Sequence, residues 1–372
     1  MNAPKLRFKE FNDEWISQKL FQLVEFSKGN ILAKADLDET GSYPCILYGQ
    51  LYTKYNEVIR EIYSKTNRNE NNIPKSKKGD VLIPSSGETP IDISTSSCIQ
   101  IDNVLIGGDI NILRPISCDG RFLSYLINNN KKTEIAKVAQ GHSVVHLYND
   151  NLKQVLINIP SIQEQKRISD TLELLDKKIE LQSKKIEDLK LFKLSIKNNI
   201  FKSFDKEQKM SIEELLEFEQ PTKYIVKSEE YTDNRDDIPV LTANKAFILG
   251  YCKESNFYNK ECIIFDDFTL DMKYVNFAFK VKSSAIKILT PKENINIKYI
   301  YEYMQFLNLH SEEHKRHYIS IVQKIQIPVP IFEIQNKIAT QLNCFDSKIE
   351  LENNKLLKLT ELKKGLMQNM FV

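Results

Sequence analysis

The sequence predicts an α+β fold in which two globular domains alternate with two long helices. The chain has 372 residues and is 41% hydrophobic, which is enough for two or three cores of ordinary size. A shift of 170 residues aligns 157–202 with 327–372 without a gap, and 15 of the 46 aligned pairs are identical. Apolar residues in both segments recur at spacings of four and three, as they do on one face of a long helix. The chain therefore carries a duplicated module.

The first module is predicted as a globular domain over 1–158 and a long helix over 159–204. The helical residues, from Gln163 to Phe201, would span about 58 Å at 1.5 Å per residue. Ser161, followed by Glu164 three residues later, has the pattern of a capping box and marks the start of this helix. The domain before it contains β-type runs and then an amphipathic run, at 43–47, 80–84, 109–115 and 121–127.

The second module is predicted to repeat this order, with a domain over 205–328 and a helix over 329–372. Its β-type runs and the amphipathic run after them lie at 238–241, 262–265, 285–291 and 298–304. The two helices resemble each other more than the two domains do. This difference indicates one shared scaffold role and two distinct recognition roles.

The apolar seams of the two helices are interrupted at matching places, by Gln182 and Lys193 in the first and by Glu352 and Lys363 in the second. Polar seam residues can fix register and partner choice, or they can be solvated positions of an imperfect seam. Two helices of equal length and matching seam would most simply pair within the chain as an antiparallel coiled coil. Separate dimerisation zippers are the alternative.

Composition excludes several classes of protein. Lys and Arg number 52 and Asp and Glu number 50, so any basic surface must be local. The amino terminus lacks an apolar core of the signal-peptide type, and no stretch approaches the roughly 18 apolar residues of a membrane span. We therefore expect a cytoplasmic protein without membrane contact. The sequence has no GxxxxGK[ST] phosphate loop, no Asn-Pro-Pro-Tyr motif of amino-methyltransferases and no Pro-Asp dipeptide of PD-(D/E)xK nucleases.

Several short motifs accompany this order of parts. They are the segment 4–8 with Trp15, the strand 80–84 with the polar loop after it, Gln140 and Gly141, and the segment 159–168 that runs into the helix. Together with the duplicated helix, they resemble the specificity subunit of type I restriction and modification systems. The second half departs from this pattern, because it lacks counterparts to Gln140, Gly141 and Ser161.

This resemblance implies a bacterial, non-catalytic subunit with no cofactor, catalytic residue or metal of its own. Its two target-recognition domains would each read one half of a split sequence in double-stranded DNA. It would bind two modification subunits, which carry S-adenosylmethionine and methylate adenine N6. Through them it would reach restriction and translocase subunits, which use ATP and Mg and cleave unmethylated DNA.

Candidate DNA contacts lie in loops after the predicted strands. Amide, hydroxyl and carboxylate groups can read base edges, while Lys and Arg mostly position the phosphate backbone. In the first domain the candidates are Gln50, Tyr52, Lys54, Ser85, Ser86, Glu88, Thr89, Gln140, His142 and Ser143. In the second domain they are Thr242, Asn244, Lys245, Asp266, Asp267 and Thr269, with Lys280, Lys282, Lys315 and Arg316 as phosphate partners.

Two other functions stay open at this point. His310, Glu313 and His314 read HxxEH, the pattern of a zinc metallohydrolase in which two histidines bind the metal and the glutamate acts as base. The alternative to this metal site is a polar surface in a Lys/Arg-rich stretch. A protein-binding coiled-coil scaffold is the other possibility, and it predicts no salt-dependent affinity for DNA.

Overall fold

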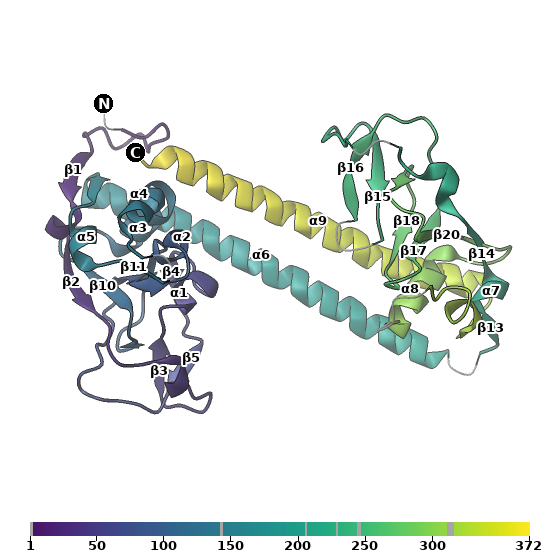
Figure 1. The fold of residues 1–372 in the computed structure, drawn as a ribbon, viewed down its shortest axis with the longest axis horizontal. Helices are drawn as coiled ribbons and strands as arrows, with labels where there is room; N and C mark the ends of the chain where they lie inside the picture. The colour runs from purple at the N-terminus through teal and green to yellow at the C-terminus, as the bar shows by residue number, and fades with distance from the viewer. Residues whose placement is uncertain (1–2, 142–143, 205–206, 228–229, 244–246, 311–315) are drawn as a thin grey trace. The chain divides into compact units, whose positions relative to one another are not determined.

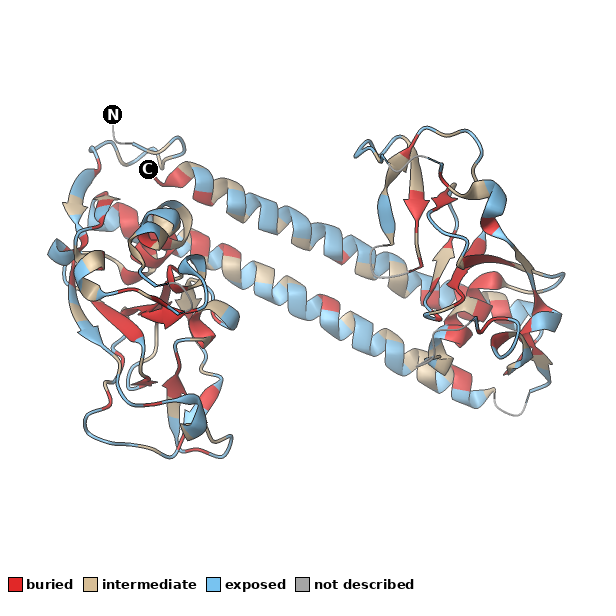
Figure 2. Cartoon of the chain, in the orientation of Figure 1, coloured by how far each residue is buried: buried red, intermediate tan, exposed pale blue. Residues whose placement is uncertain are grey.

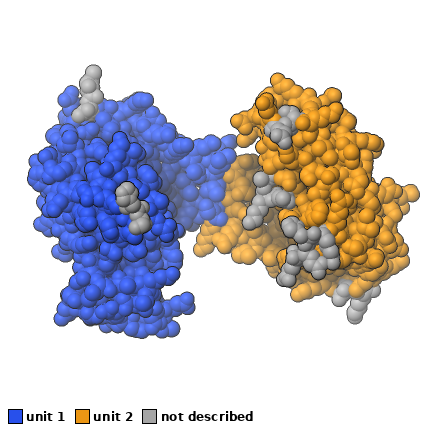
Figure 3. Space-filling view, viewed as in Figure 1, with its two compact units in different colours: residues 1–183, 355–372 blue, residues 184–354 orange. Residues whose placement is uncertain are grey.

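The computed structural model describes residues 3–141, 144–204, 207–227, 230–243, 247–310 and 316–372. The chain forms two compact units, shown in Figure 3. Unit 1 contains residues 1–183 and 355–372, and unit 2 contains residues 184–354. Each unit holds one globular domain together with parts of both long helices. A membrane-spanning helix is not found in the described ranges.

Domain 1 is built on a five-stranded sheet (Figure 1). Neighbouring strands are antiparallel except for β4 and β8. Alternate residues of β6 enter different cores, since Val81 and Ile83 pack with Phe122 whereas Leu82 packs with Ile112. The sheet is therefore buried on both faces, which explains its consecutive apolar residues. In spatial order its strands are β2 (Val24–Lys28), β10 (Ile110–Pro115), β6 (Val81–Pro84), β8 (Ser97–Ile99) and β4 (Val58–Ile59).

Shorter elements surround this sheet. Two strand pairs are β1 (Ile16–Lys19) with β12 (Leu156–Ile159), and β7 (Ser86–Gly87) with β11 (Val145–His146). A small sheet has the order β5 (Ser64–Thr66), β3 (Tyr43–Ile46), β9 (Leu105–Ile106). The helices of domain 1 are α1 (Gln50–Thr53), α2 (Pro90–Ile93), α3 (Gly120–Leu126), α4 (Lys132–Val138) and α5 (Asn149–Lys153).

Domain 2 repeats this plan in reduced form. Its main sheet has the order β14 (Leu216–Glu219), β20 (Ile286–Pro291), β17 (Cys262–Asp266), β18 (Met272–Val275). A second sheet has the order β16 (Ile248–Cys252), β15 (Ile238–Leu241), β19 (Lys280–Val281), and β13 (Lys209–Ser211) pairs with β21 (Gln326–Pro328). The helices are α7 (Ile212–Leu215) and α8 (Ile297–Leu307). The predicted β-type runs are strands in both domains, and the amphipathic runs after them are the helices α3 and α8.

The two long helices are α6 (Ile162–Ser203), with 42 residues, and α9 (Phe332–Met370), with 39. In unit 1, Leu172 of α6 shares a core with Met367 of α9. In unit 2, Phe201 of α6 shares a core with Ile338 of α9. A second pair in each unit gives their direction, because Asp176 meets Lys363 in unit 1 and Lys193 meets Asp346 in unit 2. Within each unit the helices are therefore antiparallel, as predicted. Figure 2 shows that the buried residues of the two helices lie mostly near their ends, where a domain packs on them. The division of the chain at 158, 204 and 328 stays a prediction.

The start of α6 differs from the predicted capping box. The Ser161 hydroxyl accepts a hydrogen bond from the Glu164 backbone N–H at 3.4 Å, as expected. The Glu164 carboxylate, however, does not return to Ser161. It is buried and receives two bonds of 2.7 Å from the guanidinium of Arg7. Glu164 therefore ties the amino-terminal segment to α6, a role that local spacing does not reveal.

A buried glutamine joins each domain to its helix in the same way. The Gln165 amide accepts a bond from the Asp119 backbone N–H and donates one to Pro160 O, both at 2.9 Å. Its counterpart Gln335 accepts from the Asn296 N–H and donates to the carbonyl of Pro330, again at 2.9 Å. Both side chains are 1% exposed. Asp119 and Asn296 are the N-caps of α3 and α8, so each glutamine links a long helix to a domain helix.

Replacing this glutamine should destabilise unit 1. We expect Gln165→Met to lower the free energy of unfolding by about 1–3 kcal/mol, because a similar volume is kept while buried polar groups of Asp119 and Pro160 lose their partner. Urea denaturation of the full chain measures the change. Gln163→Met, at an exposed position on the same helix, serves as the control. Equal loss in both variants would contradict the assigned role.

A second contact between domain 1 and α6 is ionic. Glu173 of α6 lies 2.6 Å from Arg60, 2.7 Å from Arg121 and 3.3 Å from Lys177. Burial alone would raise the pKa of the Glu173 carboxyl. Hydrogen bonds from Arg121 and Arg60, with their charges, outweigh that effect and lower the pKa from its ordinary value of 4.5 to about 2.

This shift predicts an acid-dependent part of the stability. Because the folded-state pKa of Glu173 lies below the unfolded value, its contribution is present above about pH 4.5 and is lost as the pH falls toward 2. We expect the difference in melting temperature between the wild type and Glu173→Gln to shrink over that range. Thermal melts from pH 2 to pH 6 measure it. A difference that is independent of pH would show that the carboxylate charge is not responsible.

Candidate nucleic-acid interface

Several of the candidate side chains in domain 1 lie at or near its surface. They are Tyr52, Lys54, Glu88, Thr89 and Gln140. Thr89 also shapes the backbone, because it is the N-cap of α2. Its hydroxyl accepts a bond from the Asp92 N–H at 3.2 Å and donates to the Asp92 carboxylate at 2.6 Å. Two further candidates of domain 1, His142 and Ser143, lie outside the described residues.

Strand pairing brings these loops together. β7 pairs with β11, and Ser86 stands opposite His146. Gln140 and His146 exchange backbone hydrogen bonds of 2.9 and 2.7 Å. Gly141 has φ 125°, and a Cβ there would lie 2.1 Å from the Val144 carbonyl, so only glycine fits this turn. The loop at 85–89 and the described residues of 140–146 therefore lie together, and their exposed residues form one surface.

Aromatic side chains also lie at this surface. Burial raises the pKa of the Tyr52 hydroxyl, and the nearby Tyr48 and Glu88 raise it further. The rings of His146 and Tyr148 stack with centroids 6.1 Å apart. Rings can stack on bases, while hydroxyl, amide and carboxylate groups can read base edges. Tyr48 and Tyr148 were not among the predicted contacts, although both are tyrosines near the predicted loops.

Other candidates in domain 1 lie inside it. The Gln50 amide accepts a bond from the Leu47 N–H at 3.0 Å and donates to Ser64 Oγ at 2.5 Å. Ser85, which connects β6 to β7, and Ser86, the first residue of β7, are also buried. Within the described structure, these three residues support the loops and do not present a side chain to a partner.

Polar candidates in domain 2 are largely used within the domain. Asp266 Oδ1 accepts bonds from the N–H groups of Phe268 and Thr269 at 2.9 and 3.0 Å. Asp267 accepts the Tyr318 N–H at 2.8 Å and lies 3.2 Å from the ammonium of Lys287. These contacts fix the turn after β17, whereas the side chain of Thr269 itself is exposed.

The four cations that were predicted to contact phosphate have different surroundings. Lys280 is 2% exposed, and its ammonium lies 2.7 Å from Glu254, so it is used within the domain. Lys282 and Arg316 are exposed, and they lie over the rings of Tyr231 and Phe268 at 5.6 and 5.8 Å. Thr242 is half-buried. Asn244, Lys245 and Lys315 lie outside the described residues.

The histidine pattern that suggested zinc is only partly described. His310 is exposed, whereas Glu313 and His314 lie outside the described residues. The nearby His317 is buried, and its backbone N–H donates to the backbone and side-chain oxygens of Asp267. Among the described residues, no group of three or more His, Cys, Asp or Glu side chains is placed to hold a metal ion.

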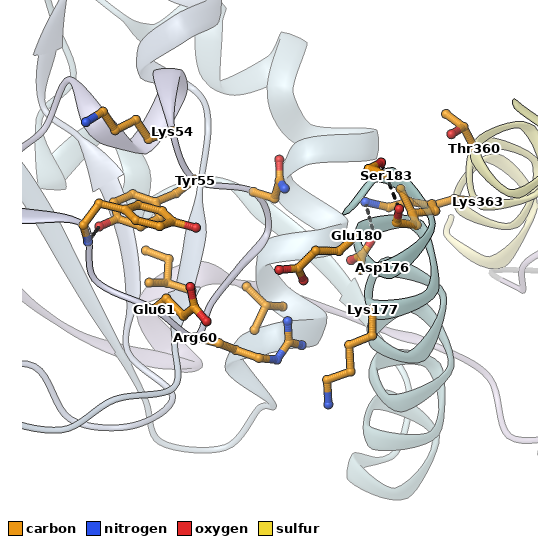
Figure 4. A pocket seen from close by; sticks show the side chains of 15 residues that line it. Lys54, Tyr55, Arg60, Glu61, Asp176, Lys177, Glu180, Ser183, Thr360 and Lys363 are labelled. Atoms are coloured by element: carbon orange, nitrogen blue, oxygen red, sulfur yellow. Dashed lines mark hydrogen bonds and ion pairs between the residues drawn. The ribbon is translucent and has the colours of Figure 1, made fainter. Parts of the chain in front are cut away.

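Each unit contains a hollow between its domain and its helices. The hollow in unit 1 encloses about 570 Å³ and is lined by Lys54, Glu61, Asp176, Glu180 and Lys363, among others (Figure 4). The hollow in unit 2 encloses about 380 Å³ and includes Asp346, Glu350 and Lys193. These last three are the identical partners of Asp176, Glu180 and Lys363 in the internal repeat. The internal repeat in the sequence therefore indicates that the two hollows are equivalent.

Comparison with known proteins points in one direction. The sequence matches the type I restriction modification DNA specificity domain twice, over residues 12–191 and 205–361. Over 125 residues, 32% of this chain, it is 45% identical to the EcoR124I/EcoR124II specificity subunit of Escherichia coli, and this match spans only 31% of that subunit. A putative type I specificity subunit (MjaX) of Methanocaldococcus jannaschii is 23% identical over 98% of this chain and 95% of its own length.

Solved structures show the same fold. The S subunit of a type I restriction-modification system from M. genitalium superposes with a TM-score of 0.75 at 18% identity, covering 100% of this chain and 99% of that one. A chain from a structure of type I complex assembly and conformational transition gives 0.54 at 14% identity, covering 96% and 97%. Because two specificity domains account for most of the sequence, the chain belongs to the family of type I restriction-modification DNA specificity subunits.

Proposed function

We propose that each of the two domains reads one half of a split sequence in double-stranded DNA, and that the chain is not itself an enzyme. The observation that carries this proposal is the duplication of the specificity domain. One small domain discriminates only a few base pairs, each worth about 1–3 kcal/mol, whereas two tethered readers combine their specificities. Methylation and cleavage then come from partner subunits.

The surfaces proposed to contact DNA follow from exposure. In domain 1 we propose the surface formed by the loops at 85–89 and 140–146 together with α1. In domain 2 we propose the exposed candidates around β17 and β19. Hydroxyl, amide and aromatic groups would read bases, and cations would neutralise phosphates. The proposed contacts are Tyr52, Lys54, Glu88, Thr89 and Gln140 in domain 1 and Thr242, Thr269, Lys282 and Arg316 in domain 2, with the undescribed candidates kept as predictions.

Two identical modification subunits are the proposed direct partners. Leu181 of α6 and Leu351 of α9 are equivalent in the internal repeat, and they are 67% and 49% exposed. Equivalent exposed side chains on the two helices would let each half of the chain make the same contact. Their repetition supports two copies of one partner, one for each half of the chain. S-adenosylmethionine would belong to these partners, and ATP and Mg to the restriction subunits that join through them.

DNA binding by the assembled complex should depend on the exposed cations. We expect Arg316→Ala to reduce the slope of log Kobs against log salt by about 1, because one fewer counterion is released. Fluorescence anisotropy with a cognate duplex at several salt concentrations measures the slope. Lys358→Ala removes an exposed charge from α9 and serves as the control. A slope that does not change in Arg316→Ala would remove Arg316 from the interface.

The split target itself can be read in cells. We expect deletion of this gene to remove one adenine-N6 methylation motif made of two half-sites around a fixed gap, and re-expression with cognate modification subunits to restore it. Single-molecule sequencing of genomic DNA detects the motif. Loss of no motif in the deletion strain, together with none gained on co-expression, would reject DNA reading and favour a scaffold.

A further inference from the structure

In unit 1, one lysine connects three parts of the structure. Lys363 of α9 places its ammonium 2.7 Å from Asp176 of α6 and 2.9 Å from Glu57 of domain 1. The Tyr125 hydroxyl, on α3, donates a 2.5 Å hydrogen bond to the other oxygen of Asp176. Figure 4 shows Lys363 reaching across from α9 to Asp176. The domain and both helices of unit 1 therefore meet at one mostly buried ammonium.

In unit 2 the equivalent lysine does the same. Lys193 of α6 lies 2.6 Å from Asp346 of α9 and 2.8 Å from Glu302 of domain 2. Glu302 is 1% exposed and also lies 3.0 Å from Lys298, which is 2.8 Å from Asp346. Lys197 also approaches Glu302, at 3.7 Å, so three ammonium groups face two carboxylates in this group.

The two groups are equivalent by position. Lys193 and Lys363, and likewise Asp176 and Asp346, are identical pairs of the internal repeat. The domain helices contribute from one shared position, since Tyr125 and Glu302 both lie six residues after the N-cap of their helix. The residue that the domain contributes has nevertheless changed. In unit 1 Glu57 contacts the lysine and Tyr125 contacts the aspartate, whereas in unit 2 the domain helix residue Glu302 contacts the lysine itself. We call each group of lysine, aspartate and domain carboxylate a clamp.

Each clamp holds a mostly buried charge that needs its carboxylate partners. Burial would lower the pKa of each lysine, but the two carboxylates beside it raise the pKa of both Lys363 and Lys193 above the ordinary value. The ammonium therefore stays charged, and moving the domain away would leave buried charges without partners. Such a group resists rotation of the domain on its helices more than an apolar contact does, because hydrogen bonds are directional.

We propose that Lys363 and Lys193 are positioning residues that hold each recognition domain at a fixed angle on its helices and thereby set the gap between half-sites that the chain accepts. This inference rests on the proposed reading of a split DNA target. A domain about 30 Å across that tilts by about 6° moves its far face by about one base-pair rise, 3.4 Å. A loosened clamp would therefore let the domain tilt and accept a gap of a different length. The side chains that read the bases would stay unchanged.

The test uses the full chain co-expressed with cognate modification subunits, with the gap spectrum of the methylated motif as readout. We expect Lys363→Met and Lys193→Met each to keep both half-site sequences. Each should reduce the preference for the wild-type gap over gaps one base pair longer or shorter by roughly tenfold, equivalent to about 1.4 kcal/mol. Lys364→Met and Lys190→Met, which remove exposed neighbours on the same helices, should leave the preference unchanged.

A gentler variant keeps the inference testable if a methionine variant does not fold. Glu57→Gln removes the negative charge that domain 1 places beside Lys363 and leaves Lys363 paired with Asp176, so a relaxation of the gap in the same direction is expected. Lys363→Arg should retain a strict gap. A strict gap in Glu57→Gln protein that melts like wild type would overturn the proposal, and so would altered bases within a half-site. Absence of any split motif with the wild-type chain would instead reject the DNA-reading function itself.

Discussion

The apolar ends of the two long helices depend on the domains for their burial, and this dependence organises the structure. Leu172 of α6 and Met367 of α9 enter one core with Phe122 of domain 1, while Phe201 and Leu342 enter another with Tyr299 of domain 2. Long helices with an apolar seam are not stable alone in water, because most helix stability comes from tertiary packing. Each domain therefore buries the apolar residues at the helix ends on which it packs, and domain and helices share one core.

The same dependence explains where the internal repeat is retained. Several of its identical pairs contact the domains, among them Gln165 with Gln335, Asp176 with Asp346 and Lys193 with Lys363. A change at one of these positions would leave a buried polar group without its partner. Exposed loop side chains carry no such penalty. Under the proposed function, the two domains can thus diverge in their loops while keeping the same attachment to the helices.

The structure also shows how part of the positive charge in this chain, whose net charge is +2, is used. Many of the cations are used internally, as Lys280 is with Glu254, Lys287 with Asp267 and Lys298 with Asp346. Buried ammonium groups of this kind support the fold but offer no charge to a phosphate. If the chain reads DNA as proposed, its affinity depends on a limited set of exposed cations, on aromatic and hydroxyl groups, and on the charge of its partners.

The sequence alone determined the architecture, because the signals involved are local. The strand runs, the amphipathic helices and the duplicated seam all appear in the periodicity of neighbouring residues, and each is found in the structure. It did not determine which polar side chains face outward. Gln50, Asp267 and Lys280 look like surface residues in the sequence, yet each is buried with a partner distant in the chain. Only the tertiary structure decided this, because burying a polar group is favourable only where the fold supplies its partner.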